Sequence, residues 1–455
     1  MCYHTGWFSV LSVLVFSVIS VGLPCLATPS PSPWNQMLVK HMWHAIPDNW
    51  LILDHPPNST TIDFRIALKA HRENALIDAL HEVSHPRHPK HVIFTSTPQL
   101  EAYSRVPLPR FRYGAHLSRE QVSELVAPHP DTLELVCSWL KYNGVPPSSI
   151  SMSHGGSWLT VSGVSVPQAN KLLGASYKVY YHAWTNETIL RTVGYALPAV
   201  LHTHVKTIIP TTAFTSTGHP QQMTLSRSGG EAAHAANISL GEPSDALSRR
   251  DGDDDAYVKP SNLRWHYNTV FNRPAAADRN ALGIAGFADE KPGPEDQASF
   301  MTKFRTDLDP NDRTVRIVSI NGGAEVGDRR KPGKLGNLDT QYSVAMTYPT
   351  PIFYYVTGGR RWVDPETGKP GRGDQYLEWL LYITEEPDIP QTISVPYFIK
   401  EPDITAEYAK ALCDLFARLG SRGVSVLVAS GDDGVGQWDS YEFYTVFPAS
   451  CTSDV

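Results

Sequence analysis

The sequence predicts an α/β protein in which a parallel sheet flanked by helices forms the C-terminal half and a separate α+β domain precedes it. Three observations predict this class. Short apolar strands alternate with helical patterns in the second half of the chain, which is typical of βαβ units. A low-complexity stretch at residues 215–255 divides the chain and is too polar to form a core. The 455 residues are enough for two or three domains.

The first 27 residues are predicted to be a secretory signal peptide. An apolar run from Phe8 to Leu23 precedes Cys25-Leu26-Ala27, which places small residues at the −3 and −1 positions of a cleavage site after Ala27. The run is short for a membrane span and polar sequence follows at once, so we expect secretion. An uncleaved anchor is the alternative, because only His4 can carry a side-chain charge before the run.

Composition excludes some partners. The formal charge of −7 and the 19% of charged residues describe a mildly acidic soluble protein. There is no lysine- or arginine-rich block, so we expect no nucleic-acid partner. No later segment is apolar enough to span a bilayer, so we expect no membrane association after signal cleavage. Three glycosylation sequons agree with secretion, and they begin at Asn58, Asn186 and Asn237.

The region from Ser30 to Phe214 mixes helical patterns with short strands, and we expect it to be the α+β domain. The low-complexity stretch that follows, at 215–255, is rich in Ser, Gly, Ala and charge and shows no apolar periodicity. It is therefore predicted to be a flexible linker. Within it, Arg249-Arg250 precedes an acidic run and would suit a dibasic processing protease.

The second half, residues 256–455, contains the regular pattern. Apolar strands are expected at Ala281–Phe287, Val315–Ile320, Ile352–Val356, Thr392–Val395 and Val424–Ala429. The clearest helix is TAEYAKALCDLFARLG, whose apolar residues recur at helical spacing and whose Gly420 is expected to end it. The last strand stops at Ser-Gly-Asp-Asp-Gly, so Asp432 and Asp433 are expected at the sheet edge where α/β proteins bind ligands.

The cysteines show neither zinc-ligand spacing nor a dense disulfide framework. After the signal peptide, Cys137, Cys413 and Cys451 remain. One bridge is allowed in an oxidising compartment, with Cys413 and Cys451 as the favoured pair. Buried free thiols are an equally good interpretation.

The chain resembles the sedolisins, a family of serine-carboxyl peptidases, and within it the fungal secreted tripeptidyl-peptidase branch. In the second half the similar segments are VKPSNLRWHYN, LGIAGF, LGNLDTQY, ASGDDGVG and FPASC. In the first half, RYGAHLSREQV, WLTVSGVSVPQANKLLGASY and RTVGYALPAVLHTHV resemble the activation prodomain of that family. Any one motif is weak, but the ordered set covers nearly the whole chain from Ser30 to Cys451.

The resemblance implies a subtilisin-like catalytic sheet in which a serine nucleophile is activated by a glutamate that an aspartate orients. It also implies peptide or protein substrates, a partner in the chain's own prodomain, and a calcium ion. Asp432 would be the aspartate that stabilises the oxyanion. A carboxyl group can donate a hydrogen bond to an oxyanion only while it is protonated, which fits a peptidase that works in acid.

Two departures from the family affect the chemistry. The family motif Glu-Ala-x-Leu-Asp-x-Gln-Tyr stands here with Asp339 present but with Leu335 at the position of the general base. Leucine cannot accept a proton. Without that partner, Asp339 would be a helix N-terminal acid that favours the helix dipole.

The family serine, in a Gly-Thr-Ser context, is also absent from the sequence. We expect the catalytic domain to be incomplete at its C-terminus, and the calcium ligands to be among the residues that this chain lacks. The first hypothesis is therefore an acid serine-type peptidase precursor whose 455 residues are inactive as they stand. A second is a non-catalytic secreted homologue whose prodomain binds or inhibits peptidases. The third is an unrelated α/β binding protein.

Overall fold

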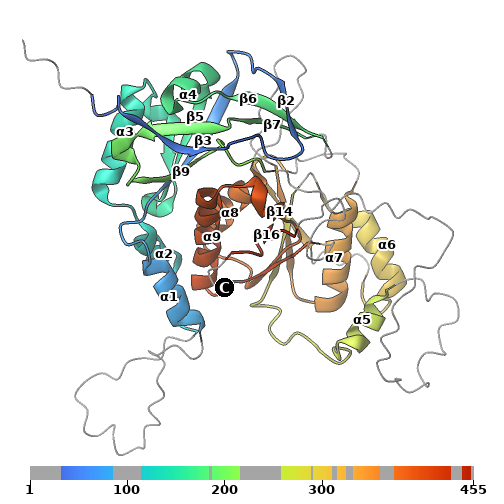
Figure 1. Cartoon of the computed structure of the whole chain (residues 1–455). Helices are drawn as coiled ribbons and strands as arrows, with labels where there is room; N and C mark the ends of the chain where they lie inside the picture. The colour runs from blue at the N-terminus through green and yellow to red at the C-terminus, as the bar shows by residue number, and fades with distance from the viewer. Residues whose placement is uncertain are drawn as a thin grey trace, which may run out of the picture.

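The computed structural model describes residues 32–85, 114–183, 187–215, 258–287, 290–309, 315–323, 332–358, 374–431 and 443–451. Below we call residues 32–215 the N-terminal half and residues 258–451 the C-terminal half. Figure 1 shows the two halves packed against each other. The expected signal peptide and all but the first residue of the expected linker lie outside the described residues.

The N-terminal half combines antiparallel sheets with four helices among its described residues. Its elements are β1 (Met37–Met42), β2 (Trp50–Asp54), β3 (Thr61–Leu68), α1 (Ala75–Ser84), α2 (Arg119–Val126), α3 (Pro130–Tyr142), β4 (Ile150–Met152), β5 (Trp158–Ser165), α4 (Val166–Leu173), β6 (Lys178–His182), β7 (Thr188–Arg191), β8 (Gly194–Pro198) and β9 (Val205–Ile209). The strands pair in the orders β4-β5-β3-β9, β2-β6-β7 and β1-β8. This is the α+β arrangement that the sequence predicts for this half.

Local sequence explains where several of these helices begin and end. Ser118 caps α2, and with Gln121 it forms a reciprocal capping box that satisfies two free backbone N–H groups. The Ser165 side chain caps α4 by accepting a hydrogen bond from the Gln168 N–H, and a proline lies in the first turn of the helix. Helix α4 ends at Gly174, whose φ of +53° is left-handed and suits glycine.

The C-terminal half is built around a parallel five-stranded sheet in the order β11-β12-β10-β13-β15. Its elements are α5 (Pro260–His266), β10 (Leu282–Gly286), α6 (Pro294–Phe304), β11 (Val315–Ile320), α7 (Lys334–Thr347), β12 (Ile352–Thr357), α8 (Gln375–Glu385), β13 (Thr392–Val395), β14 (Ile399–Lys400), α9 (Ala406–Ser421), β15 (Ser425–Val428) and β16 (Val446–Phe447). All five strands predicted for the parallel sheet are confirmed, with ends shifted by at most one residue.

Side chains alternate between the two faces of this sheet, as strand geometry requires. On one face, Ala285 and Tyr355 pack with α8 and α9 in the largest core cluster. On the other, Ile284 and Tyr354 pack against α6 and α7. Because helices cover both faces, the central strands are apolar on both sides, which is why they read as continuous apolar runs in the sequence.

The predicted end of helix α9 is wrong. Gly420 lies inside the helix and is buried, and the helix continues to Ser421. The chain then turns at Gly423, whose φ is +86°. The start agrees with prediction, because the Thr405 side chain accepts the Tyr408 N–H as an N-cap. A glycine marks a helix end only when it takes the left-handed conformation, and here Gly423 is the glycine that does so.

Helices α8 and α9 lie between the parallel sheet and the N-terminal half (Figure 1). The core cluster that they form also takes in Trp158, Ile209 and Ala213 from the N-terminal half. A second apolar cluster joins Leu76 and Leu80 of α1, together with residues of α2, to α9. The two halves therefore share a hydrophobic core where they meet.

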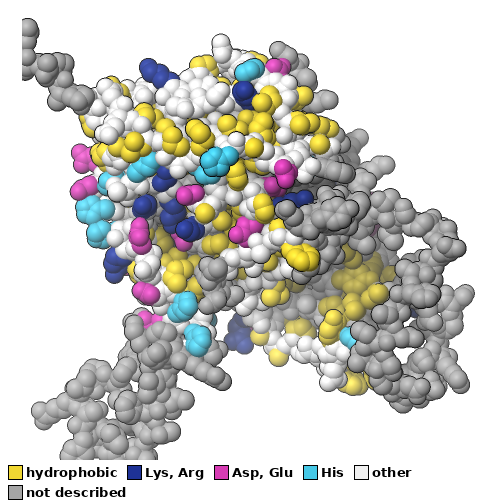
Figure 2. Space-filling model, viewed as in Figure 1, with side chains coloured by type: hydrophobic (Ala, Val, Ile, Leu, Met, Phe, Trp, Pro, Cys, Tyr) yellow, Lys and Arg dark blue, Asp and Glu magenta, His cyan; other side chains and the backbone are white. Residues whose placement is uncertain are grey.

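Some apolar surface remains uncovered. Figure 2 shows apolar side chains gathered over the upper part of the N-terminal half, where β1 and β2 run; Val39 and Leu51 are each 59% exposed. In the C-terminal half, Leu427 on edge strand β15 is 60% exposed. Among the helices that the structure describes, none is long and apolar enough to cross a membrane.

Candidate active site

The carboxyl ends of the parallel strands meet one end of helix α7, and the candidate site lies there. Strand β10 ends at Gly286 and leads to Glu290. Helix α7 begins at Lys334 and carries Asp339. This is the edge at which open α/β sheets bind ligands, because the strand ends and the following connections converge on it.

Asp339 is in the second turn of α7, not in the first as expected of a dipole-stabilising acid. Burial and, second, the negative charge of Glu290 raise the pKa of Asp339 to about 7. Its Oδ2 atom is buried without a hydrogen-bond partner among the described residues. A carboxyl group with these properties can hold or release a proton close to neutral pH, which is the usual requirement of an acid–base group.

Glu290 is the site residue that the sequence did not reveal. Its Oε2 atom accepts a hydrogen bond from the backbone N–H of Gly336 at 3.2 Å. The hydroxyl of Tyr354 donates to the Glu290 carbonyl at 3.4 Å, and that of Tyr397 donates to the Phe287 carbonyl at 3.2 Å. These two buried tyrosines hold the connection after β10 near α7. The only signal in the sequence was the position of Glu290 shortly after a strand that ends at the ligand-binding edge.

Leu335, which the resemblance would place at the general-base position, is partly buried and packs against the main core cluster. It therefore acts as an apolar packing residue beside the site. Asp432 and Asp433 lie outside the described residues. Gly431 is described, and its φ of +90° gives the turn at the end of β15 that glycine permits.

Cys413 and Cys451 form a disulfide with their Cα atoms 5.7 Å apart. Cys137 is a free, partly buried thiol whose pKa is raised by burial. Asn58 of the first sequon is exposed. The other two sequon asparagines, Asn186 and Asn237, lie outside the described residues. Among the described residues, no three His, Cys, Asp or Glu side chains converge as they would to hold a metal ion.

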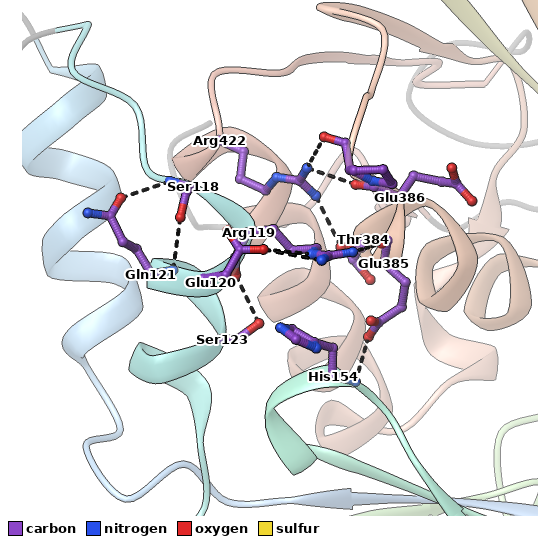
Figure 3. Close-up of polar contacts among 11 residues, drawn as sticks. Ser118, Arg119, Glu120, Gln121, Ser123, His154, Thr384, Glu385, Glu386 and Arg422 are labelled. Carbon is purple, nitrogen blue, oxygen red and sulfur yellow. Dashed lines mark hydrogen bonds and ion pairs between the residues drawn. The ribbon is translucent and has the colours of Figure 1, made fainter.

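The N-terminal half contacts the C-terminal half through polar groups away from the sheet edge. Figure 3 shows Arg119, at the start of α2, donating to the Glu385 carbonyl at 2.9 Å. The backbone N–H of His154 donates to Oε1 of Glu385 at 3.1 Å. Beside them, the N–H of Leu117 donates to the carbonyl of Ser421 at 2.8 Å. Burial at this contact raises the pKa of Glu385.

A buried ion pair joins the halves at a second point. Arg65 on β3 and Glu378 on α8 are 2.8 Å apart, and their side chains are only 6% and 12% exposed. They line a pocket of about 340 Å³ between the halves. Within the N-terminal half, Arg191 at the end of β7 donates to the Ala213 carbonyl at 2.6 Å. This bond ties the last described segment of that half to β7. The contact between the halves is therefore both apolar and polar.

Comparison with known proteins adds two findings. Residues 109–214 match the family described as Pro-kumamolisin, activation domain. The chain is also similar to Tripeptidyl-peptidase SED2 of Arthroderma otae, with 28% identity over 94% of this chain and 68% of that protein. Probable tripeptidyl-peptidase SED2 of Trichophyton verrucosum is 27% identical over the same shares. Tripeptidyl-peptidase SED4 of Arthroderma otae is 27% identical over 95% of this chain and 67% of that protein.

Proposed function

We propose that the chain is the precursor form of a secreted acid peptidase of the sedolisin family, because residues 109–214 match the pro-kumamolisin activation domain and the chain is similar to fungal tripeptidyl-peptidases. Its reaction would be serine-type peptide hydrolysis of the tripeptidyl-peptidase kind, on a subtilisin-like catalytic sheet. The observation that carries the proposal is the similarity along 94% of the chain. The parallel sheet and the position of Asp339 beside its carboxyl edge agree with it.

In this proposal residues 30–214 are the activation prodomain, 215–255 the linker with its processing region, and 256–455 the peptidase domain. The polar and apolar contacts between the halves support a prodomain seated on the catalytic part. Secretion follows from the apolar run at the N-terminus, and the exposed Asn58 would accept a glycan. Calcium remains an expectation from the family, with no ligand assigned among the described residues.

The 455 residues are proposed to be inactive by themselves. They contain no Gly-Thr-Ser nucleophile, and Leu335 cannot accept a proton. The test is to purify the secreted chain and assay it with chromogenic substrates that release a tripeptide, from acid to neutral pH. We expect no turnover above the buffer rate. Turnover that survives purification and is lost in Asp432→Asn would refute the proposal.

The second candidate is a non-catalytic homologue whose prodomain binds peptidases. One observation favours it. Arg119 and Leu117 of the N-terminal half bond to main-chain carbonyls of the C-terminal half, those of Glu385 and Ser421. Every homologous catalytic domain presents carbonyls at the ends of its helices, whatever its side chains, so the same contacts could form on another peptidase.

To test this candidate, the full chain is added to active Tripeptidyl-peptidase SED2 of Arthroderma otae and the residual activity is measured. Inhibition that weakens in Arg119→Ala would support a trans-binding prodomain. Ser123→Ala is the matched control, because Ser123 lies on the same helix and its hydroxyl donates only to the Arg119 carbonyl within α2. Absence of inhibition by the wild-type chain would reject the candidate.

A further inference from the structure

We propose that Glu290 supplies, from the connection between β10 and α6, the carboxylate that the family motif carries at the position of Leu335. Glu290 and Asp339 would then form the carboxyl pair of this chain. The chemical role of the pair rests on the proposed peptidase function. The existence of the pair does not rest on that function, and it can be measured directly in this chain.

The first observation is the position of the Glu290 carboxylate. Its Oε2 atom bonds the backbone N–H of Gly336, the residue next to Leu335, at 3.2 Å. That N–H belongs to the first turn of α7, where free N–H groups and the helix dipole favour a negative charge. The carboxylate of Glu290 thus lies at the same turn of the same helix from which the family's glutamate projects.

The second observation is the space that two glycines leave for it. A Cβ atom on Gly333 would lie 1.6 Å from Oε2 of Glu290. On Gly336 it would lie 2.8 Å from the carbonyl carbon of Lys291. The family motif carries alanine after its glutamate, at the position of Gly336. The two departures from that motif therefore fit together: glycine at 336 admits the connection, and the connection brings a glutamate where leucine has removed one.

The third observation is that the two carboxyl groups affect each other. The charge of Glu290 is the second cause, after burial, of the raised pKa of Asp339. Tyr354, whose hydroxyl bonds the Glu290 carbonyl, packs against the same face of the sheet as α7. A neighbouring negative charge disfavours ionisation of a buried carboxyl group, so the charge of Glu290 adds to burial in keeping the proton on Asp339. Glu290 is thus a positioning residue that, together with burial, favours the protonated form of Asp339.

A double-mutant cycle tests whether Glu290 occupies the base position. Leu335→Glu and Leu335→Gln remove the same apolar packing, but only the first adds a charge. If Glu290 is already there, Leu335→Glu should unfold at a temperature roughly 2–6 °C lower than Leu335→Gln near pH 8. In the Glu290→Gln background this difference should shrink to what burial and the charge of Asp339, four residues further along α7, still cause. An equal difference in both backgrounds would overturn the proposal.

A second measurement follows the carboxyl group of Asp339 by carbon-13 NMR across pH. Both Glu290→Gln and Gly333→Ala, which displaces the Glu290 carboxylate, should lower the midpoint of Asp339 by about 1 pH unit. Asp296→Asn is the matched control, because Asp296 bonds the Asn337 side chain on the same helix at 2.7 Å. It should leave the midpoint in place. If Glu290→Gln leaves it unchanged, or Asp296→Asn shifts it equally, the pair does not exist. Neither measurement uses peptidase activity, so its failure would not bear on the proposed function.

Discussion

The buried pair Arg65–Glu378 makes a quantitative prediction about how the two halves are held together. The guanidinium and carboxylate are 2.8 Å apart, with side chains 6% and 12% exposed. The Asn321 side chain also donates to Oε2 of Glu378 at 2.6 Å. Nε and Nη1 of Arg65 are buried without a partner among the described residues. Glu378 is therefore the group that compensates the Arg65 charge in the described structure.

Replacing Glu378 by Gln keeps the size of the side chain and still allows the hydrogen bond from Asn321. It leaves the buried guanidinium of Arg65 without a counter-charge. Breaking a buried pair from one side costs about 3–5 kcal/mol, because the remaining charge is still desolvated. Replacing both partners by apolar residues of similar size removes the desolvation cost as well. We therefore expect Glu378→Gln to lower the unfolding free energy by about 3 kcal/mol or more, and Arg65→Met/Glu378→Leu by much less.

The assay is equilibrium unfolding in urea, followed by tryptophan fluorescence, for the wild type, both variants and a surface control. Asp307→Asn is that control, because Asp307 pairs with Arg305 at 2.8 Å but its side chain is 60% exposed. An exposed pair contributes under about 1 kcal/mol. If Glu378→Gln costs no more than Asp307→Asn, or if the apolar double variant costs more than the single one, the reasoning from burial is wrong.

Three further predictions follow from single features. The pKa of Asp339 is about 7 in the folded state, above its ordinary value of 3.8, so proton uptake stabilises the fold as pH falls from 8 toward 4. Asp339→Asn should therefore be more stable than the wild type at pH 8, by roughly 1–4 kcal/mol. It should lose that advantage near pH 4. Thermal unfolding across pH measures this, and an advantage that grows in acid would contradict it. Gly423→Ala should lower the unfolding free energy by roughly 1–3 kcal/mol, because φ is +86° and the new Cβ would lie 2.5 Å from the His116 ring; denaturant titration should detect this, and a neutral result would show that the turn can relax. Residues 258–455 expressed alone should bind a hydrophobic dye, because α8 and α9 lose their contacts with Trp158 and Ile209; a monomeric fragment that ignores the dye and unfolds cooperatively would count against a shared core.

Much of the fold was predictable because its strands and helices are specified by patterns of neighbouring residues in the sequence. The strands of the parallel sheet are apolar runs of the right length, and their alternation with helical patterns predicts the βαβ arrangement. Helix α9 was found from its apolar periodicity, and the structure adds the Thr405 cap. Its end was not, because Gly420 and Gly423 look alike in the sequence and only backbone conformation distinguishes them.

The candidate site was predictable only in part. Asp339 is recognisable from its motif, and Leu335 from its departure from that motif. Glu290 could not be found in this way, because it is 46 residues from Gly336, to which it bonds. No local pattern records that two glycines leave room for the segment that follows β10. That contact exists only when the sheet brings the end of β10 to the start of α7.

From the sequence alone we could infer the class of the fold, the order of its elements, the resemblance to a peptidase family and the departure from that family's motif at Leu335. These depend on residue type, spacing and periodicity, which are properties of the chain itself. The tertiary structure decided which charges are buried and what compensates them. Arg65 and Glu378 are 313 residues apart, and the pKa of Asp339 depends on burial and on a carboxylate from another element. Desolvation and Coulomb energy depend on distances in space, which the order of residues does not specify.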